Sequence, residues 1–340
     1  MRQSKRDALR PVRRKRRVRI GASAVCIIAA MALTSVSAGA QSPWPSRPVK
    51  LVVPFPPGGG SDVIARVVGA RLSVRLGQQV VIENRAGAGG ALATEAVAKA
   101  PADGYTLLFT TTAMATNAAS GKKLPFDLAK DLAPVGQIGA TPLVIVAPAI
   151  SPVKTLRQLI DLARAAPHGI NYGSSGVGSM SHIGMELLAS EAKVRLLHVP
   201  YKGTSLAMTD LISGQLHAVL GTFATTGQLI EGGKLRGLAV TGAQRSTFAP
   251  NLPSVTEIGL PGAQIDFWWG LMSPARMPPE TLRRLNDELN TVLALSETRE
   301  SLAREAAVPK PGTPDVFGRL MVFEVARWSK LIKDANIRME

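Results

Sequence analysis

Three consecutive glycines follow a short apolar run in PFPPGGGSDVIAR (54–66), directly before a segment with helical spacing. Such a loop can bind an anion through its backbone N–H groups, because a helix N-terminus adds about half a positive charge. The phosphate-binding pattern G-x-x-x-x-G-K-[ST] requires a lysine after Gly60, where Ser61 and Asp62 stand instead. An acidic side chain there would repel phosphate. The loop is therefore predicted to bind an anion other than a nucleotide phosphate.

Two other glycine-rich stretches approach the dinucleotide-binding pattern G-x-G-x-x-G without completing it. GAG at 87–89 is followed by Leu92 at the final position, and GVG at 176–178 is followed by Ser181. Nucleotide binding is therefore disfavoured. These stretches still offer backbone N–H groups and hydroxyls to a ligand, as do the loops 110–117, 200–205 and 221–227.

Catalytic patterns are weak in this sequence. The nucleophile pattern G-x-S-x-G is absent, and none of the four histidines (His168, His182, His198 and His217) has a second histidine or a cysteine three or four residues away as a metal-ligand partner. His182, in the first turn of a predicted helix, has either a ligand-binding or a packing role. Asp62 either caps its helix or receives a ligand group. Lys202 either meets the ligand or is a solvated surface lysine.

These loops must be positioned by alternating strands and helices. VKLVVPF, QQVVIE and YTLLFT are typical of buried strands, and between the first two Ile64, Val68, Leu72 and Leu76 recur at helical spacing. A second alternating series runs from PLVIVAP (142–148) to LRGLAVTG, and the chain after 274 is predicted to be helical. Repeated β-loop-α units build parallel sheets whose ligands bind beyond the carboxyl ends of the strands.

The predicted fold class is α/β, with two parallel-sheet lobes, a hinge and a ligand cleft. Lobe I is expected to comprise residues 41–140 and 266–340, whose C-terminal helices return to it, and lobe II residues 141–265. Trp268 and Trp269 are adjacent, so on a strand they point to opposite faces. One is expected in the core and the other along a cleft.

The positive charge is concentrated at the N-terminus. Residues 1–40 hold ten Lys or Arg residues and one acid, Asp7, which leaves +7 of the net charge of +16 for the rest. The apolar segment that follows ends in Ala38-Gly39-Ala40, a pattern typical of a cleaved secretory signal peptide. An uncleaved anchor and a twin-arginine export route remain alternatives. The single cysteine, Cys26, lies in this segment, so the mature chain is predicted to contain no disulfide and no cysteine metal site.

From about Trp44 onward the chain resembles the Bug/TctC family of extracytoplasmic solute-binding proteins, which serve tripartite tricarboxylate transporters. The resemblance is carried, in family order, by WPSRPVKLVVPFPPGGGSDVIAR, VIENRAGAGGALATEAVAKAPADGYTLL, YGSSGVGSMSHIGMELL, HVPYKGTSLAMTDLISGQ, GKLRGLAVTGAQRSTFAPNLPSVTEIGLPG and WWGLMSPARMPPETLRRLN. The chain departs from the family pattern at Pro57, where the family often has Ala, and at Ala91, where Asn is common. The resemblance implies a periplasmic protein whose two lobes close on a small carboxylate.

The resemblance also implies which residues contact the ligand. One wall would be formed by Phe55, Gly58, Gly59, Asp62, Ala88, Thr110, Thr111, Thr112 and Asn117. The other would be formed by Ser174, Ser175, Gly176, Ser179, His182, Lys202, Gly203 and Thr204.

We therefore expect a periplasmic, non-catalytic binding protein for a di- or tricarboxylate, an acidic amino acid or an aromatic acid. It would act as a monomer, without metal, cofactor or nucleic acid, and would deliver its ligand to membrane transporter subunits or to a sensor. Two alternatives stay open: a secreted hydrolase or isomerase that uses Asp62 or His182, and a ligand-dependent sensory or interaction protein.

Overall fold

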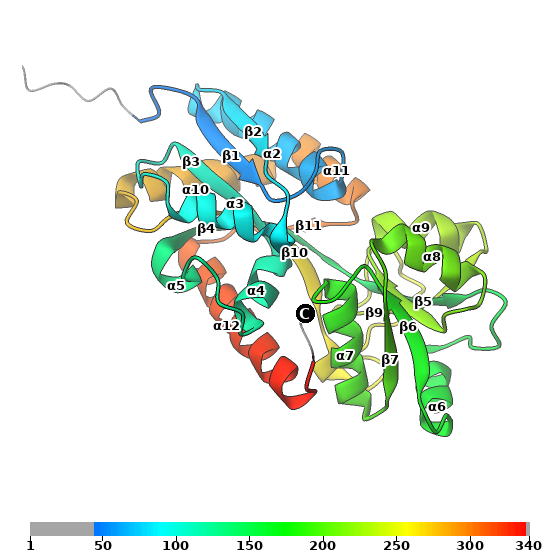
Figure 1. Cartoon of the computed structure of the whole chain (residues 1–340). Coiled ribbons are helices and arrows are strands. Elements are labelled where there is room, and N and C mark those ends of the chain that lie inside the picture. Colours follow the sequence, from blue (N-terminus) through cyan, green and yellow to red (C-terminus); the bar gives the residue numbers. More distant parts are fainter. Residues whose placement is uncertain (1–43, 338–340) are drawn as a thin grey trace, which may run out of the picture. The chain divides into compact units, whose positions relative to one another are not determined.

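Strands from both ends of the chain form the first sheet. The computed structural model describes residues 44–337, and within them this sheet has six strands in the order β11-β4-β10-β3-β1-β2 (Figure 1). The strands are β1 (Val49–Val53), β2 (Val80–Asn84), β3 (Thr106–Thr111), β4 (Leu132–Pro142), β10 (Asp266–Pro274) and β11 (Val308–Pro309). β1 runs parallel to β2 and β3, whereas β10 runs antiparallel to β3 and β4.

The second sheet is built from one continuous part of the chain. Among the described residues it has five strands in the order β7-β6-β8-β5-β9. They are β5 (Val144–Pro148), β6 (Ile170–Ser174), β7 (Leu196–Pro200), β8 (Ala218–Gly221) and β9 (Leu235–Val240). β6 is parallel to β7 and β8, and β5 is antiparallel to β8 and β9. The predicted α/β class is confirmed, but both sheets are mixed because β10 and β5 reverse direction.

The helices occupy the connections between strands and the C-terminal region. They are α2 (Gly60–Leu76), η1 (Ala88–Gly90), α3 (Ala91–Ala98), α4 (Thr112–Ala119), α5 (Leu128–Asp131), α6 (Leu156–Ala165), α7 (Met180–Ala192), α8 (Thr204–Ile212), α9 (Phe223–Glu231), η2 (Pro261–Ala263), α10 (Pro279–Ala294), α11 (Ser296–Arg304) and α12 (Pro314–Asp334). Among the described residues, no helix is long and apolar enough to cross a membrane.

Two segments expected to be loops are helical, α4 and α9. The Thr111 side chain accepts the N–H of Ala113 and so caps α4. Both helices are rich in small residues and threonine, TAMATNAA and FATTGQLIE, so neither shows a stripe of large apolar residues. Helical periodicity is invisible where the buried side chains are this small.

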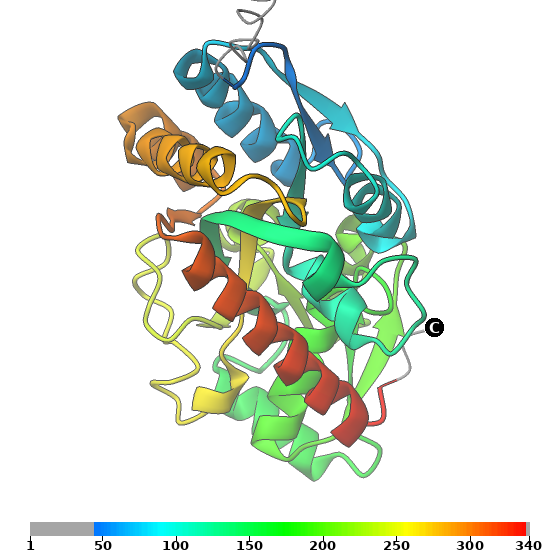
Figure 2. The same ribbon diagram turned by 90° about the vertical axis from the view of Figure 1, so that its left-hand side faces the viewer.

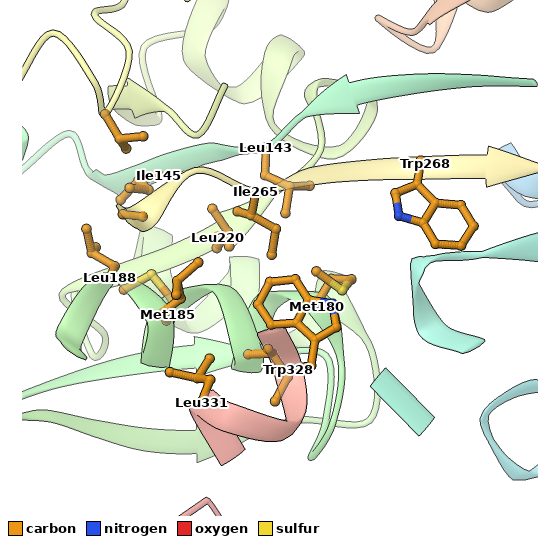
Figure 3. Close-up of a cluster of buried hydrophobic side chains, with 14 of the residues drawn as sticks. Leu143, Ile145, Met180, Met185, Leu188, Leu220, Ile265, Trp268, Trp328 and Leu331 are labelled. Carbon is orange, nitrogen blue, oxygen red and sulfur yellow. The ribbon is translucent and has the colours of Figure 1, made fainter. Parts of the chain in front are cut away.

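Helix α12 connects regions that lie far apart in the sequence. It packs against α4 and β4 (Figure 2). Arg327 in its last turns donates to the carbonyl oxygens of Gly262 and Gln264. Trp328 and Leu331 belong to one buried cluster with Met180 of α7 (Figure 3). The C-terminal helix therefore contacts parts of the chain next to both sheets. The lobe boundaries given above stay a prediction, as does the signal peptide, which lies outside the described residues.

Candidate functional site

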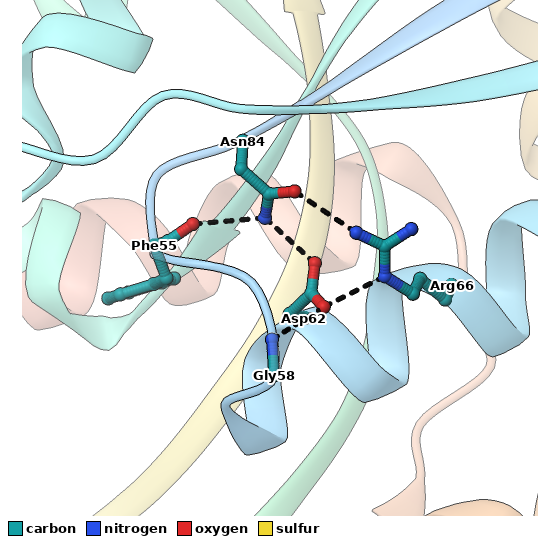
Figure 4. Close-up of polar contacts among 5 residues, drawn as sticks. All are labelled: Phe55, Gly58, Asp62, Arg66 and Asn84. Carbon is teal, nitrogen blue, oxygen red and sulfur yellow. Dashed lines mark hydrogen bonds and ion pairs between the residues drawn. The ribbon is translucent and has the colours of Figure 1, made fainter.

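Asp62 fixes the loop that contains the three glycines (Figure 4). Asp62 is 2% exposed, and its carboxylate accepts the N–H of Gly58 at 2.9 Å, Arg66 Nε at 2.8 Å and Asn84 Nδ2 at 2.7 Å. Asn84 Nδ2 also donates to the carbonyl oxygen of Phe55 at 3.0 Å. Burial alone would raise the pKa of Asp62, but the hydrogen bonds outweigh it and lower the pKa to about 2. The carboxylate is therefore charged at neutral pH, and both of its oxygens are bonded to the protein.

This geometry bears on the two roles left open for Asp62. The N-cap of α2 is Gly59, and no side chain caps it by a hydrogen bond. Asp62 instead holds the N–H of Gly58, which precedes the helix. It is placed as a positioning residue for the loop, and its contact with a ligand stays a prediction.

The loop 86–91 has an unusual backbone conformation. Gly87, Ala88, Gly89 and Gly90 have φ angles of 132°, 48°, 62° and 95°. Glycine adopts positive φ without steric cost, whereas for an alanine it costs roughly 1–2 kcal/mol. The side chain of Asn117 on α4 donates to the carbonyl oxygen of Gly89 at 2.7 Å. The loop is thus held from α4, and the strained residue is Ala88.

The three threonines at the end of β3 are buried. Thr110, Thr111 and Thr112 are 1%, 2% and 0% exposed. Thr111 caps α4, and the hydroxyl of Thr112 accepts the backbone N–H of Trp268 at 3.0 Å. The hydroxyl of Thr111 therefore joins β3 to α4, and that of Thr112 joins α4 to β10.

Neither tryptophan of the adjacent pair lies along the cavity described below. Trp268 is 2% exposed and packs edge-on against Phe317, and Trp269 is 4% exposed. The indole N–H of Trp269 donates to the hydroxyl of Ser61 at 3.1 Å, at the start of α2. The expectation that one of them lines a cleft was wrong.

Serine side chains bind backbone groups of the loop 174–179. Ser174, which is 0% exposed, accepts the N–H of Gly176 at 3.1 Å. Ser179 is the N-cap of α7, where its hydroxyl accepts the N–H of His182, and it donates to the carbonyl oxygen of Gly176 at 2.6 Å. The N–H of Ser175 is bonded to Ser181 at 3.0 Å.

Two histidines lie next to this loop. His182 is 4% exposed and its ring stacks on that of His198, with centroids 3.9 Å apart and an interplanar angle of 11°. His182 Nδ1 accepts the N–H of Gly178 at 3.0 Å, and His198 Nε2 lies 2.5 Å from Ser174 Oγ. Burial lowers the pKa of both rings, that of His182 to about 4 with a contribution from His198. Both are neutral at pH 7.

Loop 200–204 contributes to a different hollow. Lys202 is exposed, and Thr204 lines a cavity of about 430 Å³ beside α8 and α9. Its neighbour Tyr201 donates its N–H to the carbonyl oxygen of Ser174 at 3.0 Å, which ties the two loops together.

Loops attached to both sheets line one cavity of about 770 Å³. The lining comprises residues 54–56, 86–92, 95, 113, 117, 120, 122–125 and 177–179. Four of the predicted residues are on it: Phe55, Ala88, Asn117 and Ser179. The other predicted residues are not on it: Gly58, Gly59, Asp62, Thr110, Thr111, Thr112, Ser174, Ser175, Gly176, His182, Lys202, Gly203 and Thr204. Several of these hold the lining in place from outside the cavity.

The sequence reasoning missed the segment between α4 and α5. Lys122, Lys123, Leu124 and Pro125 line the cavity, and both lysines are exposed. Neither lysine forms an ion pair within the described residues. The available signal is the pair of adjacent cations, which begins five residues after the candidate binding loop 110–117.

A larger cavity, of about 1030 Å³, lies between residues 118–134 and α12. Its lining includes Met321, Val322 and Val325, and it has no residue from loops 54–61, 86–91 or 174–179. We therefore take the 770 Å³ cavity as the candidate site, because the polar loops of both sheets meet there.

The contact between Ser174 and His198 resembles a nucleophile beside its base. Ser174 is fully buried, however, and no carboxylate in the described residues bonds the other ring nitrogen of His198. Within residues 44–337 no cluster of His, Cys, Asp and Glu side chains is suited to a metal ion. The hydroxyl of Ser174 therefore lacks the access that a nucleophile needs. The cavity with its polar loops can bind and orient an anion.

Fold and site together are those of a solute-binding protein. A family model described as the tripartite tricarboxylate transporter family receptor, TctC, matches residues 64–337. The chain belongs to this family. It is 38% identical over 321 residues to a protein encoded in the tcbD–tcbE intergenic region of Pseudomonas sp. strain P51, covering 94% of this chain and 96% of that one. It is 33% identical to protein BugT of Bordetella pertussis, covering 92% and 98%.

Solved structures give the same result. Rpa4515 of R. palustris, solved with adipate, is 37% identical with a TM-score of 0.76, and the match covers 86% of this chain and 99% of that one. MatC (Rpa3494) from Rhodopseudomonas palustris, with bound malate, is 31% identical with a TM-score of 0.73, covering 85% and 100%. The resemblance to the Bug/TctC family is confirmed.

Proposed function

We propose that this protein captures a small dicarboxylate in the 770 Å³ cavity and delivers it to the membrane subunits of a tripartite transporter. The observation that carries the proposal is the cavity's lining, which joins loops 54–56 and 86–92 of the first sheet to residues 177–179 before α7. Rpa4515 and MatC, which are similar along nearly their whole length, were solved with adipate and malate.

The lining has the chemistry that a dicarboxylate needs at both ends. Ser179 caps α7, so the positive end of a 13-residue helix lies at one part of the cavity. Lys122 and Lys123 supply positive charge at another part. Phe55, Leu92 and other apolar side chains of the lining would contact the carbon chain between the two carboxylates.

Capture would proceed by closure of the two lobes about their connections. A ligand favours the closed state only if it binds that state more tightly than the open one. A ligand that contacts both walls meets this condition. The closed form would then be recognised by the transporter. This mechanism requires the protein to be periplasmic, exported by the predicted signal peptide and cleaved after Ala40.

Calorimetric titration and thermal unfolding with adipate, malate, citrate, glutamate and benzoate test the proposal. A dicarboxylate should bind saturably and raise the midpoint of thermal unfolding in proportion to the logarithm of its concentration above Kd. Benzoate, with a single carboxylate, should bind more weakly. Failure of all five acids to bind would refute the proposed function, and conversion of a bound acid to product would favour the hydrolase alternative.

A Val177→Asp variant tests the site, with Val74→Asp as its matched control. Val177 lines the cavity and is 38% exposed, so a new carboxylate there is tolerated by the fold but repels an anionic ligand. Val74, on α2, is 77% exposed and does not line the cavity. Val74→Asp should therefore bind the ligand as the wild type does. Equal binding by both variants would place the ligand elsewhere.

A further inference from the structure

The two histidines hold opposite ends of the loop 174–179. His182, in the first turn of α7, accepts the N–H of Gly178 at Nδ1. His198, on β7, is bonded through Nε2 to Ser174, whose hydroxyl also accepts the N–H of Gly176. Neither histidine lines the cavity, but Gly178 does. The stacked rings thus determine where this part of the wall lies.

The bond from Gly178 requires a particular protonation state of His182. Its Nδ1 must carry a lone pair, because a protonated imidazole has donors at both nitrogens and cannot accept the backbone N–H. Two stacked imidazolium rings would also repel each other, since their centroids are 3.9 Å apart. Burial favours the neutral form further and lowers the pKa of His182 to about 4.

Other titratable groups near the pair do not supply a counter-charge. Tyr172 on β6 stacks with His198 at 5.1 Å and donates its hydroxyl to Glu186 on α7 at 2.6 Å. Burial raises the pKa of both Tyr172 and Glu186. Glu186 is bonded to Tyr172 and to neither histidine, so no carboxylate of the described residues pairs with an imidazolium here.

We propose that His182 and His198 are positioning residues for ligand binding: the neutral pair holds Gly178 at the cavity wall and Ser174 at the other end of the loop, and protonation of His182 releases Gly178 and weakens binding. This inference rests on the proposed function, because it concerns the affinity of that same cavity. The inference goes beyond the proposed function because it states that acid promotes release of the ligand. This effect acts through His182, which the ligand does not touch.

Titration with adipate between pH 7.5 and 3.5 tests the inference on the wild type and on His182→Asn. The asparagine side chain offers a carbonyl oxygen to Gly178 but does not titrate. Protonation of adipate itself is common to both proteins and cancels in the comparison. With a pKa of about 4, His182 is mostly protonated at pH 3.5. Between pH 7.5 and 3.5 the affinity of the wild type should therefore fall about fourfold further than that of His182→Asn.

Two other variants separate positioning from folding. His182→Leu removes the acceptor and should bind adipate more weakly than His182→Asn already at pH 7.5. His217→Asn, at an exposed position directly before β8, should behave as the wild type at every pH. Circular dichroism at each pH establishes that all the variants remain folded.

Identical pH profiles for the wild type and His182→Asn would overturn the inference. So would stronger binding by the wild type in acid, which would make His182 a direct ligand. The backbone amide resonance of Gly178 provides a readout without ligand: it should titrate in the wild type and not in His182→Asn. If no acid binds at any pH, the proposed function fails, and this resonance still decides whether His182 positions the loop.

Discussion

Thr241 and Ile265 are joined by a hydrogen bond of 2.6 Å, from the threonine hydroxyl to the isoleucine carbonyl oxygen. The same hydroxyl accepts the N–H of Leu143 at 2.8 Å. Leu143 stands between β4 and β5, and Ile265 directly precedes β10, so each belongs to one of the two connections between the sheets. All three residues are buried. One side chain therefore links both connections.

Thr241→Val should destabilise the protein by about 1–3 kcal/mol, because it leaves the buried N–H of Leu143 without its acceptor. Valine has nearly the same shape, so packing is preserved. Urea unfolding measures the change. Thr209→Val, on an exposed part of α8, is the control and should change the free energy of unfolding by less than about 0.5 kcal/mol. Equal effects of the two substitutions would show that the link carries no special stability.

Asp62→Asn should remove an acid-dependent part of the stability. The pKa of Asp62 is about 2 in the folded protein against 3.8 for an unperturbed aspartate, so the unfolded chain takes up the proton first on acidification. The contribution is complete above pH 3.8 and is lost as the pH falls through 2. Urea unfolding of the wild type should therefore show a decline between pH 4 and 2 that Asp62→Asn lacks. Asp161→Asn, in an exposed pair with Arg164, should retain the wild-type decline.

Lys122→Ala combined with Lys123→Ala should weaken the binding of adipate at neutral pH by roughly two- to fivefold, the usual range for exposed charges. Calorimetric titration at low and high salt checks this, since salt screens exposed charges and should shrink the difference from the wild type. Lys154→Ala, before α6 and away from the cavity, should leave the affinity unchanged. A deficit that persists in high salt would argue against an electrostatic role.

Gly270→Ala should destabilise the fold by about 1–3 kcal/mol through overpacking. A Cβ atom at Gly270 on β10 would overlap the ring of Phe317 on α12, which is 1% exposed. Gly227, in the interior of α9, has open space around it, so Gly227→Ala should stabilise by up to about 1 kcal/mol through helix propensity. Thermal and urea unfolding distinguish the two, and a neutral Gly270→Ala would mean that α12 shifts freely.

Much of the fold could be predicted from residue patterns. Ile64, Val68, Leu72 and Leu76 are all buried on α2, as their spacing indicates, and Gly77 ends the helix with a φ of 69°. Strand β4 was missed because LAPVGQIGATP lacks the continuous apolar run of a buried strand. Its glycines instead allow close approach: a Cβ at Gly136 would meet Asn286 and Leu289 of α10 at 2.9 Å. Packing of this kind is set by a distant helix and leaves no local pattern.

The candidate site was predictable at the level of loops but not of side chains. The loops at 54–61, 84–90 and 173–179 all contribute to the cavity. Within them, residue type did not show whether a polar group faces the ligand or its own loop. Asp62 and Ser174 bond to backbone groups of their own loops, and that direction depends on tertiary contacts with Asn84 and His198.

The position of β10 has a consequence for the order in which the protein can be assembled. The second sheet lies wholly within residues 144–240, so every partner strand is present once that stretch has been made. The first sheet begins earlier in the chain but needs β10 between β3 and β4. Until Asp266–Pro274 arrives, β3 and β4 each keep an unpaired edge, which is the kind of edge that other chains can pair with. During vectorial synthesis, the sheet that starts first is therefore the one that is finished last.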